Sequence, residues 1–348
     1  MTALGLLAGV ALDQVVPDPR RGHPVAVFGT AAGRLEQAMW RDDRGRGVAY
    51  TACLVGSVVL LGIGASRVTG LKLAAATAAA TWAVLGGNSL AAEASAVDDL
   101  LRQGDLVAAR QRLTHLVGRR TQHLDEGEIA RAVIESVAEN SSDAVVAPLF
   151  WGAVAGLPGL LAYRAVNTLD AMVGHRSPRY ERFGWAAARA DDVANYVPAR
   201  LTALLAAALA PLAGGSGRAA LAVWRADGSK HPSPNAGVCE SAYAGALGLR
   251  LGGRNDYGSR TEDRPVLGGG VYGRRAGVYG RRAGLYGKGG DVYGKQGRVH
   301  AKPGRPAAAG DISRAIELSR GVTIAAALTC AAIAAISLPI AAISRRAR

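Results

Sequence analysis

The sequence has little cysteine and few aromatic residues. Its 348 residues include three cysteines, and aromatic side chains make up 5% of the chain. Cys53 and Cys330 lie within apolar stretches, and Cys239 has no cysteine or histidine at metal-ligand spacing. These positions exclude a disulfide framework and argue against a zinc site. Such a chain suits a reducing compartment such as the cytoplasm.

Several familiar motifs are also missing. The chain contains no G-x-x-x-x-G-K-[ST] phosphate loop, no H-E-x-x-H zinc motif and no G-x-S-x-G nucleophile elbow. Any nucleotide site would therefore be of a less common type. Alternating strand patterns of useful length are absent as well, so we predict a mostly helical protein.

Long uncharged stretches are what the chain has instead. Five blocks of 17 to 24 residues carry no charged side chain: 48–66, 73–92, 144–163, 201–217 and 321–344. Each is long enough to cross the ~30 Å hydrocarbon core of a bilayer. We therefore predict an all-α polytopic membrane protein of the cell membrane, with several transmembrane or re-entrant helices and interfacial amphipathic helices. A soluble protein with alanine-rich buried helices is the alternative.

A basic repeat separates two parts of the chain. Residues 271–305 repeat heptads such as V-Y-G-R-R-A-G and contribute +8 to the net charge of +14. Their glycine content rules out a coiled coil, so we predict a disordered insert between a membrane domain at 1–270 and a C-terminal transmembrane helix at 311–348. Anionic lipid or nucleic acid are its candidate partners, and repeat expansion without function is an equal alternative. We expect no specific nucleic-acid partner for the main activity.

The block 144–163 decides which polar segments share a side of the membrane. If it crosses the bilayer, the polar segments before and after it face opposite sides. Its prolines and glycines, among them Gly156 and Pro158, equally suit a broken or re-entrant segment. All polar motifs would then share one face, and the sequence leaves both topologies open.

Three carboxylates recur at four-residue steps just before this block. Glu135, Glu139 and Asp143, with Asn140 beside them, would share one face of an α-helix, where like charges repel. A bound Mg²⁺ would remove that repulsion, because carboxylate oxygens are among its preferred ligands. We therefore predict that the three carboxylates hold magnesium. The alternative is that the S-S-D sequence caps the next helix and the glutamates are merely solvated.

Further polar residues follow the block. They are Arg164, Asn167, Asp170 and His175, and then Arg189, Asp191, Asp192, Asn195 and Arg200. Arginines bind phosphate oxygens and carboxylates hold a cation, so this mixture predicts a site for phosphates and a metal. An interfacial helix with ion pairs is the alternative for Asp191 and Asp192.

Two turn-rich segments suit anion binding. The stretch S-K-H-P-S-P-N-A-G holds Lys230, His231, Ser233 and Asn235, and D-P-R-R-G-H-P-V holds His23. Backbone N–H groups in such turns, together with these side chains, form anion sites in many proteins. Plain structural turns are the alternative.

In this order, the motifs resemble the CobD/CbiB family, the adenosylcobinamide-phosphate synthases of cobalamin biosynthesis. The stretches that carry the resemblance are D-P-R-R-G-H-P-V, E-S-V-A-E-N-S-S-D-A-V-V-A-P-L-F, A-Y-R-A-V-N-T-L-D-A-M-V-G-H, R-Y-E-R-F-G-W-A-A-A-R-A-D-D-V-A-N-Y-V-P-A-R and K-H-P-S-P-N-A-G. It covers about residues 4–268 and resumes near 311. Where the family resembles S-P-N-A-G-W-P-E, this chain has Val238 and Cys239, which leaves Asn235 and Glu240 in place.

The resemblance implies a ligase that joins the free propionate carboxyl of adenosylcobyric acid to the amine of aminopropanol or its O-phosphate. ATP and Mg²⁺ are implied for activating the carboxylate, and the corrinoid is a substrate rather than a prosthetic group. Membrane lipids and other enzymes of the pathway are the expected partners, and the active face is expected to be cytoplasmic. His23, His175 or His231 would take the ammonium proton.

Within that reaction we expect two sets of residues. The catalytic set is Glu135, Glu139, Asn140, Asp143, Asn167, Asp170 and His175. The substrate- and phosphate-binding set is His23, Arg164, Arg189, Asp191, Asp192, Asn195, Arg200, Lys230, His231, Ser233 and Asn235. Two alternatives remain: a non-catalytic scaffold or transporter for corrinoid intermediates, and a CDP-alcohol phosphotransferase, although the D-G-x-x-A-R pattern of that class is missing.

Overall fold

The computed structural model describes residues 1–19, 21–175, 177–258, 261–270 and 303–346, with side chains up to residue 336. Its helices are α1 (Thr2–Val15), α2 (Pro24–Met39), α3 (Arg44–Ala65), α4 (Gly70–Val84), α5 (Gly87–Arg102), α6 (Leu106–Leu113), α7 (Glu126–Ser141), η1 (Ser142–Val146), α8 (Ala147–Leu169), η2 (Asp170–Gly174), α9 (Trp185–Ala194), α10 (Tyr196–Leu209), η3 (Ala210–Ala213), α11 (Gly217–Asp227), η4 (Gly228–Lys230), α12 (Ala236–Leu247) and α13 (Gly310–Arg346). The prediction of a helical protein is confirmed. Residues 271–302 of the basic repeat lie outside the described residues.

Four helical segments of the described chain are long and apolar enough to cross a membrane. They are Arg44–Ala65, Glu126–Gly174, Tyr196–Ala213 and Gly310–Ile336, and α1 is a shorter apolar helix. The chain is thus an all-α polytopic membrane protein, as predicted. The block 73–92 was predicted as one apolar span. In the structure it is divided between two helices, because α4 ends at Val84 and α5 begins at Gly87.

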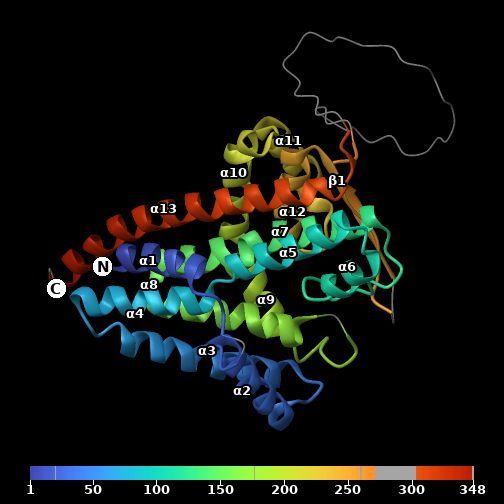
Figure 1. Ribbon diagram of the computed structural model, residues 1–348. Coiled ribbons are helices and arrows are strands. Elements are labelled where there is room, and N and C mark those ends of the chain that lie inside the picture. The colour runs from blue at the N-terminus through green and yellow to red at the C-terminus, as the bar shows by residue number, and fades with distance from the viewer. Residues whose placement is uncertain (20, 176, 259–260, 271–302, 347–348) are drawn as a thin grey trace, which may run out of the picture.

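The molecule has an apolar end and a polar end. Figure 1 shows α1, α3, α4, α8 and the C-terminal part of α13 side by side at one end, and α5, α6, α7, α12 and the strands at the other. Glycines let α1 and α4 approach closely, since a Cβ at Gly5 would lie 2.4 Å from Thr77 Cβ and one at Gly9 would lie 2.3 Å from Thr81 Cβ. Small residues at four-residue spacing are a common device for packing helices within membranes.

The α8 segment is a hairpin rather than one straight helix. Gly156 interrupts it with φ 63° and ψ −152°, a conformation that is essentially restricted to glycine. The Tyr163 hydroxyl donates to the Asp143 carbonyl at 3.1 Å, although 20 residues of straight helix would separate them by about 30 Å. The chain therefore enters the apolar end, turns at Gly156 and returns. Of the two topologies that the sequence leaves open, this hairpin favours the re-entrant one.

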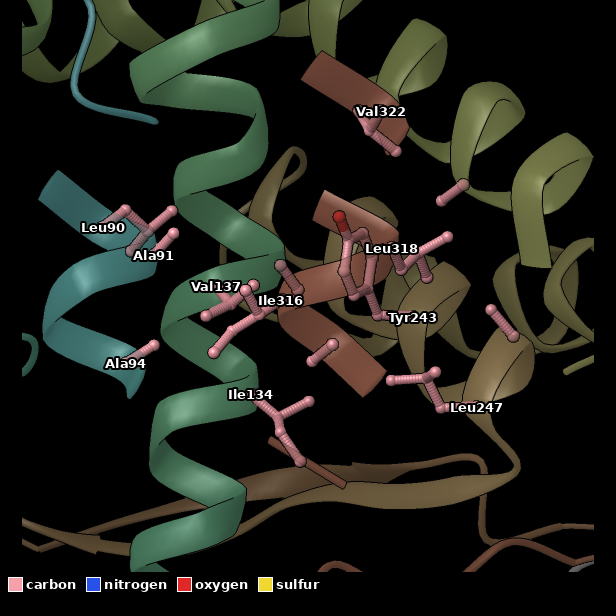
Figure 2. Packing of buried hydrophobic residues seen from close by; sticks show 14 of the residues in the cluster. Leu90, Ala91, Ala94, Ile134, Val137, Tyr243, Leu247, Ile316, Leu318 and Val322 are labelled. Carbon is pink, nitrogen blue, oxygen red and sulfur yellow. The ribbon is translucent and has the colours of Figure 1, made fainter. Parts of the chain in front are cut away.

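The hydrophobic core of the polar end lies between four helices. Figure 2 shows Leu90, Ala91 and Ala94 from α5, Ile134 and Val137 from α7, Tyr243 and Leu247 from α12, and Ile316, Leu318 and Val322 from α13. Two hydrogen bonds tie these helices together, because Ser141 Oγ lies 2.8 Å from Ser319 Oγ and accepts from the Tyr243 hydroxyl at 2.9 Å. This core holds α7, and with it the predicted carboxylates, in a fixed position.

A small sheet was not predicted. Strand β1 (Leu249–Asp256) pairs antiparallel with β2 (Thr261–Leu267) and parallel with β3 (Arg305–Pro306). Glycines and charges in β1 obscure the alternation, and its pairing has a register shift between Leu251 and Gly253. Arg305, the last residue of the predicted insert, belongs to this sheet.

The hairpin can be tested by labelling single cysteines with a membrane-impermeant maleimide, in a Cys53→Ala background. Gln122→Cys, before α7, and Pro178→Cys, after η2, are expected to react from the same side of the membrane. Val68→Cys, between α3 and α4, is expected to react from the opposite side. Reaction of Gln122→Cys and Pro178→Cys from opposite sides would mean that α8 crosses the bilayer once.

Candidate active site

The S-S-D helix cap, the alternative to a metal site, is not observed, because the helix continues. After α7, Ser142–Val146 forms the π-helical segment η1, which leads directly into α8. The second π-helical segment, η2, begins at Asp170 and follows α8. Such wide turns are frequent at functional sites. They place Asp143 and Asp170 at the two polar ends of the α8 hairpin.

Glu135 is paired with basic groups. Its carboxylate lies 3.1 Å from Arg119 Nη2 and 3.2 Å from Arg131 Nη1, and it accepts from the Gly252 N–H at 2.8 Å. The side chain is 8% exposed. These partners use both carboxylate oxygens and tie α7 to β1, so Glu135 is accounted for by a structural role rather than by metal binding.

Four other carboxylates come together; we call Glu139, Asp143, Asp170 and Asp191 the acidic centre. They come from α7, η1, η2 and α9, and they are close enough to repel one another electrostatically. Each is half-buried. Arg164 of α8 is a cation that interacts with Asp143. A cluster of this kind attracts cations, because its own negative charges exceed the positive charge nearby.

Amide side chains position Asp191. Asn195 Nδ2 donates to Asp191 Oδ2 at 3.0 Å, and Asn167 Nδ2 donates to Asp191 Oδ1 at 3.4 Å. The Tyr163 hydroxyl lies 2.9 Å from Asn195 Oδ1. Burial raises the pKa of Asp191, the charge of Asp192 adds to this rise, and the two amide hydrogen bonds oppose it. Asn167 and Asn195, both predicted site residues, therefore act on the acidic centre through Asp191.

The segment S-K-H-P-S-P-N-A-G lies against α9 and α10. Asn235 Nδ2 donates to the Asp192 carbonyl at 2.8 Å, and Asn235 Oδ1 accepts from Arg200 Nη1 at 2.8 Å. Ser233 Oγ accepts from the N–H groups of Asn235 and Ala236 at the start of α12. The segment is thus a structural turn that joins α12 to α9.

Other predicted residues have their contacts outside the acidic centre. Lys230 pairs with Asp227, and Arg189 pairs with Asp192 at 3.5 Å. His175 is exposed and its ring packs edge-on against Tyr180 at 4.9 Å. Asn140 Nδ2 donates to the Ser136 carbonyl at 2.9 Å on its own helix.

His23 and His231 each use Nδ1 in a hydrogen bond, and the buried Nε2 atom of each has no hydrogen-bond partner among the described residues. His23 Nδ1 accepts from the Val25 N–H at 3.3 Å, and its Nε2 lies 3.4 Å from Asp18. His231 Nδ1 accepts from the Ser233 N–H at 3.1 Å, and its Nε2 lies 3.8 Å from Glu240. Burial, aided by the charge of Arg264, lowers the pKa of His231.

Three polar residues near the centre were not predicted as site residues. Tyr163 joins the two arms of the α8 hairpin, and Asp18 interacts with both His23 and Arg164. Glu240 is 1% exposed, and burial, with Glu135 and Glu139 nearby, raises its pKa well above the ordinary value. Asp18 and Glu240 both stand in the motifs that carry the family resemblance, which was the available signal.

The carboxylates of the acidic centre suit a magnesium ion only if a substrate supplies further ligands. Within the described part of the chain, no three His, Cys, Asp or Glu side chains are arranged to hold a metal ion. Mg²⁺ is often bound by one or two carboxylates while substrate phosphates and water complete its shell. The acidic centre offers such carboxylates, with Glu139 and Asp143 on adjoining turns of one continuous helix.

These features define a class: a helical membrane protein whose acidic polar centre lies at the mouth of a re-entrant hairpin. The comparisons give the family. Residues 6–277 match the model of the CobD/CbiB protein family, so the chain belongs to that family. Membership supports a role in cobalamin biosynthesis.

Curated relatives agree with this assignment. The cobalamin biosynthesis protein CobD of Mycobacterium tuberculosis is 54% identical over 269 residues, which cover 77% of this chain and 86% of the relative. The protein of the same name from Geobacter metallireducens is 45% identical over 278 residues, covering 77% and 87%. That of Rhodobacter capsulatus is 45% identical over 260 residues, covering 72% and 80%. No solved structure matches the chain significantly.

The different roles of Glu135 and Glu139 can be tested through stability. Glu135→Gln is expected to lower the free energy of unfolding by about 3 kcal/mol, because Arg119 and Arg131 lose a buried charged partner. Glu139→Gln, one helical turn away, is the matched control and is expected to keep or raise the unfolding midpoint, because it removes one of several repelling charges. Thermal unfolding in detergent measures both, and equal losses would contradict the assignment of Glu135.

Proposed function

We propose that the chain is a membrane-bound ligase of cobalamin biosynthesis. It forms an amide bond between the propionate carboxyl of adenosylcobyric acid and the amine of aminopropanol or its O-phosphate, and it uses ATP and Mg²⁺. Membership of the CobD/CbiB family supports the pathway. The observation that carries the proposal is the acidic centre, where carboxylates from four segments meet beside Arg164.

The basic group in this arrangement suits an anionic substrate. Arg164 Nε has no hydrogen-bond partner among the described residues, and Nη1 has only a long contact of 3.4 Å to Asn167. A guanidinium with unused donors binds carboxylate or phosphate oxygens well. We assign Arg164 to the corrinoid carboxylate or to a phosphate of ATP.

The carboxylates suit the two cations of the reaction. Glu139 and Asp143 would hold Mg²⁺, which when bound with ATP neutralises charge on the transferring phosphoryl group. Asp191, fixed by Asn167 and Asn195, would attract the ammonium group of the second substrate.

The ammonium must lose a proton before it attacks the activated carboxyl. His23 and His231 each have an Nε2 atom without a hydrogen-bond partner among the described residues, 3.4 Å from Asp18 and 3.8 Å from Glu240 respectively, whereas His175 packs against Tyr180. His23 and His231 therefore each have a ring nitrogen that can accept this proton, and a carboxylate of the acidic centre is the alternative. We place this centre on the cytoplasmic side, where ATP is available.

The reaction can be tested with purified protein in liposomes containing adenosylcobyric acid, aminopropanol phosphate, ATP and Mg²⁺. Wild type is expected to give the amide, followed by mass, and Glu139→Gln or Asp191→Asn is expected to lose activity by about 100-fold or more. Glu181→Gln, an exposed carboxylate on a nearby loop, is the control and is expected to keep full activity. Corrinoid binding without product, in wild type, would instead support the scaffold or transporter.

Metal removal gives a separate test. Chelating Mg²⁺ is expected to abolish amide formation, and restoring Mg²⁺ is expected to recover it, because the acidic centre depends on a cation to hold phosphates. The unfolding midpoint without ATP is expected to change little on chelation, since the carboxylates are not arranged as a complete metal site. Full activity in the chelated enzyme would refute the metal assignment.

A further inference from the structure

The segment Tyr196–Ala213, which is α10 followed by η3, is apolar and long enough to span a bilayer, yet both of its ends lie on the polar side of the molecule. At its start, Asn195 bonds to Tyr163 and Asp191 in the acidic centre. At its far end, the carbonyls of Ala213 and Gly214 accept from Arg314 at 3.1 and 3.4 Å.

Arg314 lies well within the polar end. It is five residues before Ser319, which contacts Ser141 at the end of α7, so Arg314 lies toward the sheet from that contact. On α13 the outward side chains change from Glu317 and Arg320, both exposed, to Ile324 and Leu328, which are 62% and 61% exposed. The membrane boundary on α13 therefore falls after Arg320, and the end of α10 lies outside it.

The two faces of α10 differ in an unusual way. Its inner face consists of small residues, and Ala199 and Ala203 pack against Val238, Cys239 and Ala242 of α12. Large apolar side chains point outward instead on α10 and on its two neighbours: Val193 at the end of α9, Tyr196, Val197 and Leu204 on α10, and Leu212 on η3 are 74%, 55%, 51%, 51% and 78% exposed. A helix that faces water usually shows polar residues on that side.

Basic and aromatic residues accompany this apolar stripe. Arg200 lies over the ring of Tyr196 at 3.7 Å, and Arg189 is 66% exposed on its side chain. At the start of α9, Arg44 lies 5.4 Å from the ring of Trp185, and Arg44 is also the first residue of the candidate span α3. Aromatic and basic residues are typical of the headgroup region of a bilayer.

We propose that α9 and α10 lie flat on the membrane surface, with the stripe of Val193, Val197, Leu204 and Leu212 inserted among lipid headgroups. Through Trp185 and Arg44 the start of α9 adjoins the candidate span α3, and the flanking arginines complement lipid phosphates, so a bilayer fits better than a protein partner. Arg189 then contacts lipid rather than substrate. The proposal depends on these contacts and exposures and not on the proposed reaction.

The test uses a fluorescent label on single cysteines in a Cys53→Ala background, in vesicles of phosphatidylcholine and phosphatidylglycerol. Leu204→Cys reports on α10, and Leu328→Cys on α13 is the reference for the membrane interior. Val107→Cys on α6, where the valine is 74% exposed at the polar end, is the matched control for an exposed apolar side chain. Quenching is measured with lipids brominated near the headgroup, with lipids brominated deep in the chains, and with aqueous iodide.

The Leu204 label is expected to lose most fluorescence with the shallow bromolipids, the Leu328 label with the deep ones, and the Val107 label only with iodide. Deep quenching at Leu204 would mean that α10 spans the bilayer, and iodide quenching alone would mean that it faces water. Protection from all three quenchers would mean that a second copy or another protein covers the stripe. Each of these three outcomes overturns the proposal, and each can be obtained with an inactive enzyme.

Discussion

The reversal of the chain at Gly156 is the constraint on which the acidic centre depends. A straight helix through α8 would place Asp143 and Asp170 about 40 Å apart. Because Gly156 adopts a conformation open essentially to glycine alone, the two aspartates return to the same end and interact. Tyr163 then joins the returning arm to the Asp143 carbonyl and to Asn195. The hairpin thus converts two distant segments of sequence into one site.

Like charges brought together at a half-buried site repel one another and destabilise the fold. The carboxylates of this region differ in how fully neighbouring positive charges compensate that repulsion. Around Glu135 it provides two arginines and a backbone N–H, so that carboxylate is satisfied within the protein. Around Glu139, Asp143, Asp170 and Asp191 the compensation is incomplete, with Arg164 and Arg264 as the interacting cations. Uncompensated negative charge lowers the stability of the fold, but it favours binding of a cationic ligand, because the ligand reduces the repulsion between the carboxylates.

Much of this could be predicted from the sequence, and the failures have physical causes. Residue type and spacing predicted the helices and the apolar spans, and they singled out Glu139, Asp143, Asp170 and Asp191, which the structure brings together. Spacing could not show that Glu135 and Glu139 have different roles, because Arg119 and Gly252, the partners of Glu135, come from other segments of the chain. The strands were missed because glycines and charges in β1 obscure the alternation, and because β3 lies after the repeat. Asn235 was predicted to bind substrate, but its side chain bonds to Arg200 and to the Asp192 carbonyl.

The α9 helix shows how a surface and a site can share one short segment. Ala187, Asp191 and Asn195 follow one another at four-residue steps and face inward, whereas Trp185, Arg189 and Val193 follow the same spacing and are exposed. Four-residue steps drift by only about 40°, so the two sets form separate stripes on one helix. Anything that fixes the outer stripe also fixes the depth of Asp191. A membrane surface on that side would therefore hold the acidic centre at the boundary between lipid and water.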